Sequence, residues 1–151
     1  MNNRPTVSAF IGLRLVAGQR PIRPMAARLS YTREDPYAVR IVFGAGQGTP
    51  VEWMLGRDLL AAGLEGRAGL GDVKLWPSAA SAASEAAPTS LADALGGVLN
   101  IQLSSPFGQA HFEAPAGEVA DFLRRTYELV PAGEEARYYD EQLTNLLRHV
   151  S

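Results

Sequence analysis

The sequence predicts one α+β domain: an antiparallel sheet of about seven strands with a short helix among them, followed by two C-terminal helices. Three observations predict it. The 151 residues suit one hydrophobic core, apolar residues recur at every second position in segments up to Ala114, and the spacing then changes to three and four. Because tight turns join consecutive strands, we expect antiparallel pairing, with the helices covering part of the sheet to bury their own apolar faces.

The first three expected strands have the clearest pattern. Residues 7–15, 25–31 and 37–43 each carry apolar side chains at alternate positions, as a half-buried strand does. A turn with two prolines is expected over 18–24, and a second turn at Glu34-Asp35-Pro36, where proline fixes φ and acidic residues favour turn starts.

The next segment contains Gly44, Gly46 and Gly48, a spacing that could suggest a phosphate-binding loop. Such a loop needs a helix directly after it, whereas Pro50 and an alternating strand at 51–55 follow here, so we interpret the glycines as a hairpin turn. Residues 57–64 then predict a short helix ended by Gly63, with Asp58 at the positive end of the helix dipole.

The middle of the chain predicts three more strands and one irregular segment. Gly71-Asp72 opens a strand over 73–76 that Pro77 stops, and residues 99–103 and 110–114 form a hairpin through the turn at 105–108. Between them lies a segment of about 79–97, rich in alanine and serine, which predicts a flexible excursion within the same domain, with a helical turn at 91–95.

Two amphipathic helices are expected at the end. Residues 115–130 place Val119, Phe122 and Leu123 on one face, and 131–133 break that helix. The last helix opens at Asp140-Glu141 and carries one apolar face. That face consists of Leu143, Leu146, Leu147 and Val150.

Composition limits the function. With no cysteine, the chain has no disulfide, thiolate metal site or cysteine nucleophile. No apolar run reaches the ~20 residues that span a bilayer and no signal-peptide core precedes Gly18, so we expect a soluble protein without direct membrane insertion. The net charge of −2 and pI of about 5.7 differ from the basic surface of duplex-binding domains, although the N-terminal third is rich in arginine and the C-terminal third is acidic.

No residue pattern predicts catalysis. His111 and His149 are the only histidines; His111 falls on the polar face of a strand, and no serine has the spacing of a nucleophile elbow. Carboxylates fit solvated helix faces, and clusters with metal-ligand spacing are absent from the sequence. We therefore expect no catalytic, cofactor-binding or metal-binding residues, no cofactor, and a protein that is not an enzyme.

Aromatic residues suggest packing or partner contacts. Trp53 shares its parity with Val51 and Leu55 and is expected in the core, whereas Trp76 fits a core or an interface position equally well. Tyr138 and Tyr139 are expected to pack the last helix, because basic residues do not interleave with them as at a base-stacking surface.

Several sequence blocks, in their order and spacing, resemble the SsgA-like proteins of sporulating actinobacteria, and the resemblance runs from about Val7 to His149. Two features depart from the family. The segment at 79–95 is longer than expected for its members, and residues 1–5 are an N-terminal extension. The matching blocks are YTREDPYAV at 31–39, VEW at 51–53, RDLL at 57–60, GL at 63–64, GDV at 71–73, WPS at 76–78, LSSP at 103–106 and EAP at 113–115.

The resemblance implies a regulator of sporulation-specific cell division that positions septa by recruiting or modulating FtsZ, the tubulin-like division protein, an activity attributed to SsgB-type members. It also implies a curved sheet similar to Whirly-type and mitochondrial guide-RNA-binding proteins, a homotrimer, contacts with other division or sporulation proteins, and a cytoplasmic location at division septa. The alternative function is a single-stranded nucleic-acid-binding module of Whirly-like fold. The acidic pI and the single lysine, Lys74, argue against nucleic acid.

The resemblance supplies no catalytic residues. Three residues of the matching blocks, Arg57, Asp58 and Trp76, are candidates for a partner-binding surface. For Arg57 and Asp58 the structural alternative is the start of the short helix.

Overall fold

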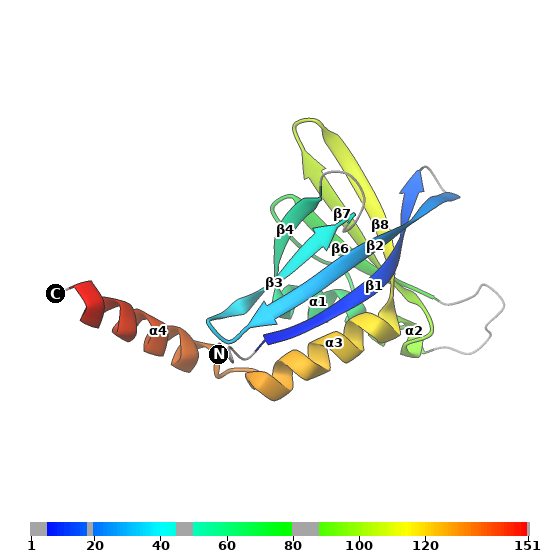
Figure 1. The fold of residues 1–151 in the computed structure, drawn as a ribbon. Helices are drawn as coiled ribbons and strands as arrows, with labels where there is room; N and C mark the ends of the chain where they lie inside the picture. The colour runs from blue at the N-terminus through cyan, green and yellow to red at the C-terminus, as the bar shows by residue number, and fades with distance from the viewer. Residues whose placement is uncertain (1–5, 18–19, 45–49, 80–87, 151) are drawn as a thin grey trace.

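The computed structural model describes residues 6–17, 20–44, 50–79 and 88–150. Eight antiparallel strands form one curled sheet in the order β4-β3-β2-β1-β8-β7-β6-β5 (Figure 1). The strands are β1 Thr6–Ala17, β2 Arg20–Thr32, β3 Asp35–Phe43, β4 Val51–Gly56, β5 Ala68–Leu70, β6 Val73–Ser78, β7 Val98–Ser105 and β8 Gly108–Pro115. The helices are α1 Arg57–Glu65, α2 Leu91–Ala94, α3 Ala116–Leu129 and α4 Glu135–Val150.

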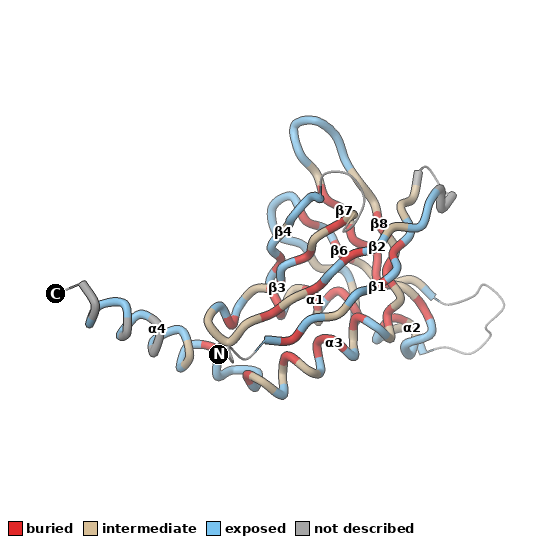
Figure 2. The backbone as a smooth tube through the Cα atoms, viewed as in Figure 1, coloured by how far each residue is buried: buried red, intermediate tan, exposed pale blue. Residues whose placement is uncertain are grey.

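Alternating apolar side chains fill the inside of the curl, as the period of two predicts. On β3, for example, Val39, Ile41 and Phe43 are buried, and the ring of Phe43 stacks on Phe112 of β8 with centroids 4.5 Å apart. α1 lies against β5 and β6. α3 runs along β1 (Figure 1). The buried residues of the tube in Figure 2 follow the inner side of the strands and the sheet-facing side of α3.

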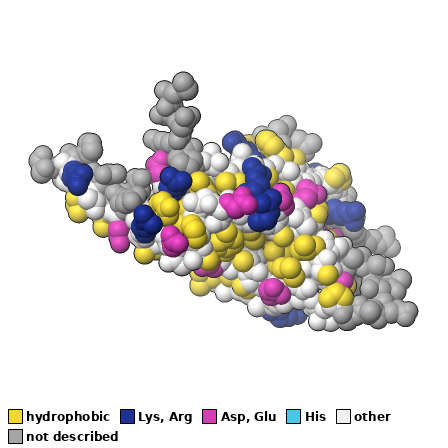
Figure 3. Space-filling model, turned by 90° about the horizontal axis from the view of Figure 1, so that it is seen from below, with side chains coloured by type: hydrophobic (Ala, Val, Ile, Leu, Met, Phe, Trp, Pro, Cys, Tyr) yellow, Lys and Arg dark blue, Asp and Glu magenta, His cyan; other side chains and the backbone are white. Residues whose placement is uncertain are grey.

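α3 has the predicted amphipathic character. Its Val119, Phe122 and Leu123 are buried, while the exposed Arg124 bonds to Asp121 and Glu128, each at 2.7 Å. Seen from below, charged side chains lie among hydrophobic ones on this side of the molecule (Figure 3). None of the helices in the described ranges combines the length and apolarity needed to cross a membrane.

The prediction of an antiparallel sheet with helices is confirmed, and eight strands replace the expected seven. The additional strand, β5, has three residues with Gly69 at its centre, too few to show an alternating pattern. β2 begins at Arg20, so the turn predicted over 18–24 was wrong from residue 20 onward, Pro21 and Pro24 included, while residues 18–19 lie outside the described ranges. β3 pairs with β2 from Ala27 onward, and no strand among the described residues pairs with residues 20–25 on that side. A proline there leaves no hydrogen bond of the sheet unmade.

Four predicted element ends were also wrong. The turn predicted at Glu34-Asp35-Pro36 forms at residues 33–34, and β3 already begins at Asp35, so the prediction was wrong for Asp35 and Pro36 only. The carbonyl of Pro36 accepts a 2.9 Å hydrogen bond from Tyr31. Pro77 lies within β6, beyond the part of that strand that β5 pairs. α1 continues past Gly63 to Glu65, and α4 begins at Glu135, five residues before the predicted start.

The excursion predicted over 79–97 is described in part, because residues 80–87 lie outside the described ranges. The predicted turn at 91–95 forms as α2, but with a left-handed backbone in which φ runs from 41° at Ala92 to 74° at Leu95. Gly97 follows it, in contact with the backbone of Ser78 and Ala92, where a side chain would not fit.

Candidate interaction surfaces

Arg57, the first residue of α1, is buried at the junction of α1, α3 and α4, with 1% of its surface exposed. Its guanidinium donates hydrogen bonds to the carbonyls of Thr126 and Val130, at 3.1 and 2.7 Å, and to the carboxylate of Glu135 at 2.6 Å. The first two bonds satisfy carbonyls at the C-terminal end of α3, where a cation is favourable. The third bond fixes the first turn of α4.

Two tyrosine rings enclose the same guanidinium. Its Cζ lies 5.0 Å from the ring centroid of Tyr31 and 4.1 Å from that of Tyr127, within the range of cation–π attraction. Burial raises the pKa of both phenols to about 12, and for Tyr127 the hydrogen bond to Asp58 acts in the same direction. Arg57 therefore organises the interior, and its side chain offers no surface to a partner.

The hydrogen bond from Arg57 is the largest cause that lowers the pKa of the Glu135 carboxyl below its ordinary value of 4.5. A depressed pKa contributes stability above the unfolded pKa, and this contribution is lost as the pH falls through the folded pKa. We expect the free energy of unfolding to fall as the pH drops below about 4.5, and to fall less steeply in Glu135→Gln, which cannot titrate there. Urea titrations from pH 6 to pH 3 measure both slopes, and equal slopes would contradict this role of Glu135.

The other two sequence candidates are nearer the surface. Asp58 is exposed, and its carboxylate accepts a 2.9 Å hydrogen bond from Tyr127. Trp76 is partly exposed on the outer face of the sheet, with its ring 5.1 Å from that of His111. Tyr127 links Asp58 to Arg57, whereas Trp76 lies beside His111 and shares no contact partner with them among the described interactions. A partner role for Asp58 and Trp76 stays a prediction.

A polar cluster on the outer face was not foreseen from the sequence. The buried Asn100 donates to the Trp76 carbonyl at 3.0 Å and to the Ser78 hydroxyl at 2.8 Å, and its Oδ1 lies 2.8 Å from His111 Nε2. Asn100 and Gln102 alternate with the apolar residues of β7 as on an ordinary solvated strand face, so the sequence carried no sign that Asn100 is buried. The cluster ties β6, β7 and β8 together, and we assign it a structural role.

The most exposed apolar helix surface belongs to α4. Its base packs against the domain: Tyr139 contacts Tyr37 edge to face at 5.9 Å, and Tyr138 lies beside Arg33, which supports the predicted packing role of this tyrosine pair. Beyond this base the helix projects away from the sheet (Figure 1). The expectation that both terminal helices cover the sheet was thus wrong for this part of α4, and Leu143, Leu146 and Leu147 are 45%, 60% and 61% exposed.

An apolar cavity of about 410 Å³ occupies the end of the curl that α1 does not fill. One wall comes from the inner faces of β2, β3 and β4, and the other from the β7–β8 hairpin. Trp53, expected in the core, is partly buried and lines this cavity. The lining residues are Arg23, Met25, Phe43, Gly44, Val51, Trp53, Leu103, Ser104, Ser105, Phe107, Gly108, Gln109, Ala110 and Phe112.

Comparison with protein families gives one match over most of the chain. Residues 25–135 match the family described as Streptomyces sporulation and cell division protein, SsgA. The chain is 43% identical over 135 residues to the sporulation-specific cell division protein SsgB of Thermobifida fusca, covering 89% of this chain and 88% of the relative. It is 42% identical over 144 residues to SsgB of Streptomyces coelicolor, covering 94% and 96%.

Solved structures agree with this match. The crystal structure of the SsgA-like sporulation-specific cell division protein from Thermobifida fusca aligns with a TM-score of 0.81 at 39% identity, covering 99% of both chains. A structure from a study of SsgB mutations and longitudinal cell division during sporulation of Streptomyces coelicolor aligns with a TM-score of 0.76 at 41% identity, covering 91% of this chain and 98% of the other.

Proposed function

The chain belongs to the SsgA family of sporulation and cell-division proteins, and we propose that it serves that process as a non-catalytic regulator that binds other proteins. The similarity to SsgB supports a role in cell division during sporulation. The observation that carries the mode of action is α4, which projects away from the sheet (Figure 1) and whose leucines Leu143, Leu146 and Leu147 are 45%, 60% and 61% exposed. Exposed apolar surface of this kind marks protein contacts.

The partner in this proposal is FtsZ, which the family resemblance implies. The chain positions sporulation septa by recruiting FtsZ or modulating its assembly, and it is a cytoplasmic protein that accumulates at septa together with other division and sporulation proteins. The test is whether the chain pellets with FtsZ filaments of the same organism. A chain that stays in the supernatant across the range of FtsZ concentrations would contradict the proposal.

Self-association is the second part of the proposal, with the homotrimer as the assembly that the resemblance implies. The apolar face of α4 supplies a contact surface, and an oligomer presents several copies of one weak partner site to a filament. Several weak contacts on one filament reinforce each other through effective concentration, so an oligomer prefers filaments to free subunits.

We expect the triple substitution Leu143→Gln, Leu146→Gln and Leu147→Gln to dissociate the oligomer, because it removes apolar contact area worth about 25 cal/mol per Å². Light scattering coupled to size exclusion measures the mass. Thr144→Gln, exposed on the same helix, is the control and should keep the wild-type mass. A wild type that is already monomeric at high concentration, or a triple variant of unchanged mass, would contradict this part.

A further inference from the structure

The two edges of the sheet differ in how they are protected against further strands. β5, at one edge, is only three residues long. β4, at the other, is six residues long with neither proline nor lysine, and its one charged residue, Glu52, lies 3.4 Å from Arg40 of β3. Proteins usually blunt an exposed edge by shortness, lysine, proline or a bulge. By these criteria β4 is the edge able to accept another strand.

The side chains of β4 support the same conclusion. Val51 is 53% exposed on the inner face and Met54 is 47% exposed on the outer face, so the edge is apolar on both sides. Val51 and Trp53 also line the cavity, opposite Phe43 and Ile41 of β3 in the strand register. Because side chains two residues apart share one face of a strand, a ninth strand on β4 would place alternate side chains over this cavity.

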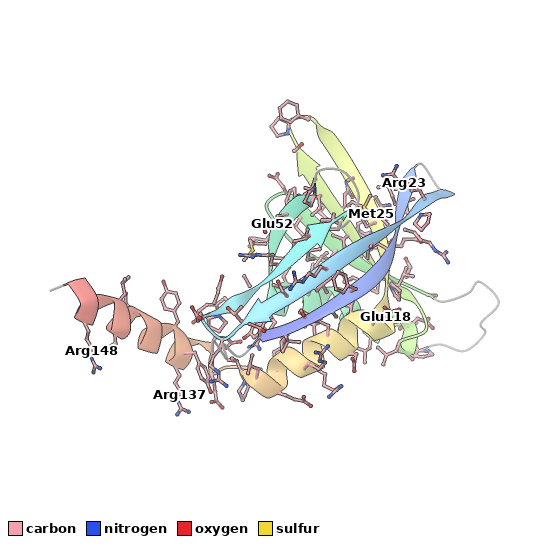
Figure 4. All side chains as sticks on the ribbon, in the orientation of Figure 1. Arg23, Met25, Glu52, Glu118, Arg137 and Arg148 are labelled. Atoms are coloured by element: carbon pink, nitrogen blue, oxygen red, sulfur yellow. The ribbon has the colours of Figure 1, made fainter. Side chains whose placement is uncertain are left out.

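Charge restricts the occupant further. Arg23 of β2 is the only charged residue of the cavity lining, and it has no ion-pair partner among the residues that the structure describes. Figure 4 shows Arg23 and Met25 on the upper part of β2 and Glu52 on β4. The surrounding wall is mostly apolar and aromatic. This combination suits an apolar side chain with a carboxylate near it.

We propose that β4 and the adjoining cavity bind an extended peptide segment of a partner protein, which pairs with β4 as a ninth strand. Its main chain bonds to the outer N–H and C=O groups of β4, an apolar side chain enters the cavity, and an acidic residue meets Arg23. Main-chain pairing supplies affinity in this mode and side-chain pockets supply specificity. A small apolar molecule would use the cavity only and leave the strand edge unpaired. The inference rests on the proposed function only in assuming a protein partner.

The test uses a fluorescein-labelled hexapeptide with aspartate at both ends, phenylalanine at the second position, leucine at the fourth, and threonine at the third and fifth. Fluorescence anisotropy should show saturable binding, and a peptide with alanine in place of phenylalanine and leucine should bind at least about tenfold more weakly, as when a buried anchor is lost. Val51→Glu and Arg23→Glu should each weaken binding by about tenfold or more, through repulsion of the acidic peptide.

Met54→Glu is the matched control, since it places the same charge on the same strand but on the face away from the cavity. It should weaken binding by less than about threefold, because an exposed charge acts through screening solvent. Hydrogen exchange should slow at the β4 amides when the peptide binds. Each of these substitutions is at an exposed position, and circular dichroism verifies that the variants remain folded.

Four outcomes would overturn the proposal. The first is the absence of saturable peptide binding, and the second is an equal loss of affinity in Val51→Glu and Met54→Glu. The third is binding without slower hydrogen exchange at the β4 amides, and the fourth is a Val51→Glu variant whose oligomeric mass changes while peptide binding persists. The third outcome would indicate a cavity ligand, and the fourth a second copy of the chain on this edge. Because the titration contains no FtsZ, its failure leaves the FtsZ pelleting result unaffected, and the two proposals fail separately.

Discussion

Arg57→Met is expected to lower the free energy of unfolding by about 3–5 kcal/mol, the cost of breaking a buried ion pair by removing one partner. The substitution leaves the buried Glu135 carboxylate without its cation and the carbonyls of Thr126 and Val130 without their donor. In a protein of this size the midpoint of thermal unfolding should fall by roughly 6–20 °C. Urea denaturation measures the free energy directly.

Two further variants make the Arg57 result specific. Arg124→Met removes an exposed arginine that also holds two carboxylates, and it should cost less than about 1 kcal/mol because solvent screens exposed pairs. Adding Glu135→Leu to Arg57→Met removes the uncompensated charge and should recover part of the loss. Similar costs for Arg57→Met and Arg124→Met would show that Arg57 does not hold the helices together.

Gly63→Val is expected to cost about 3 kcal/mol, the upper part of the range for overpacking a well-filled core. A Cβ at position 63 would lie 2.8 Å from the Cβ of Leu75 and 3.0 Å from a methyl of Leu99, so α1 would have to move away from β6 and β7. Gly12→Val is the control: a Cβ there meets nothing within 4 Å, and a β-branched residue suits a strand. If both variants unfolded at the wild-type urea concentration, the close approach of α1 to the sheet would be contradicted.

The long strands and helices could be predicted because the spacing of their apolar residues indicates which side chains are buried. On β3 and α3 the spacing of apolar residues identified the element and its buried face. The sequence pattern did not predict features that depend on contacts between distant residues. β5 is a strand because it pairs with β6. Gly63 lies inside α1, where the helix approaches the sheet too closely for a side chain, and does not end the helix. Pro21 is compatible with β2 because, within the described part of the chain, only β1 pairs with the strand at that position.

The candidate surfaces were predictable only in part. The apolar face of the last helix is visible in the spacing of its leucines, but the sequence could not indicate that the helix leaves the sheet. Arg57 at the positive end of a helix dipole was a signal that it has a special partner, because a cation is unfavourable there. Its partner Glu135 is 78 residues away, a separation that no local pattern can bridge. The cavity likewise depends on how far the sheet curls.

Whether the chain acts on FtsZ as an oligomer can be measured by pelleting it with polymerised FtsZ from the same organism. Three forms are compared at equal subunit concentration: wild type, the triple variant Leu143→Gln, Leu146→Gln and Leu147→Gln, and Thr144→Gln. We expect wild type and Thr144→Gln to pellet alike, and the triple variant to need at least about tenfold more FtsZ for half-maximal pelleting, because loss of multivalency costs at least that much. A wild type that does not pellet, or a monomeric triple variant that pellets as well as the wild type, would contradict this expectation.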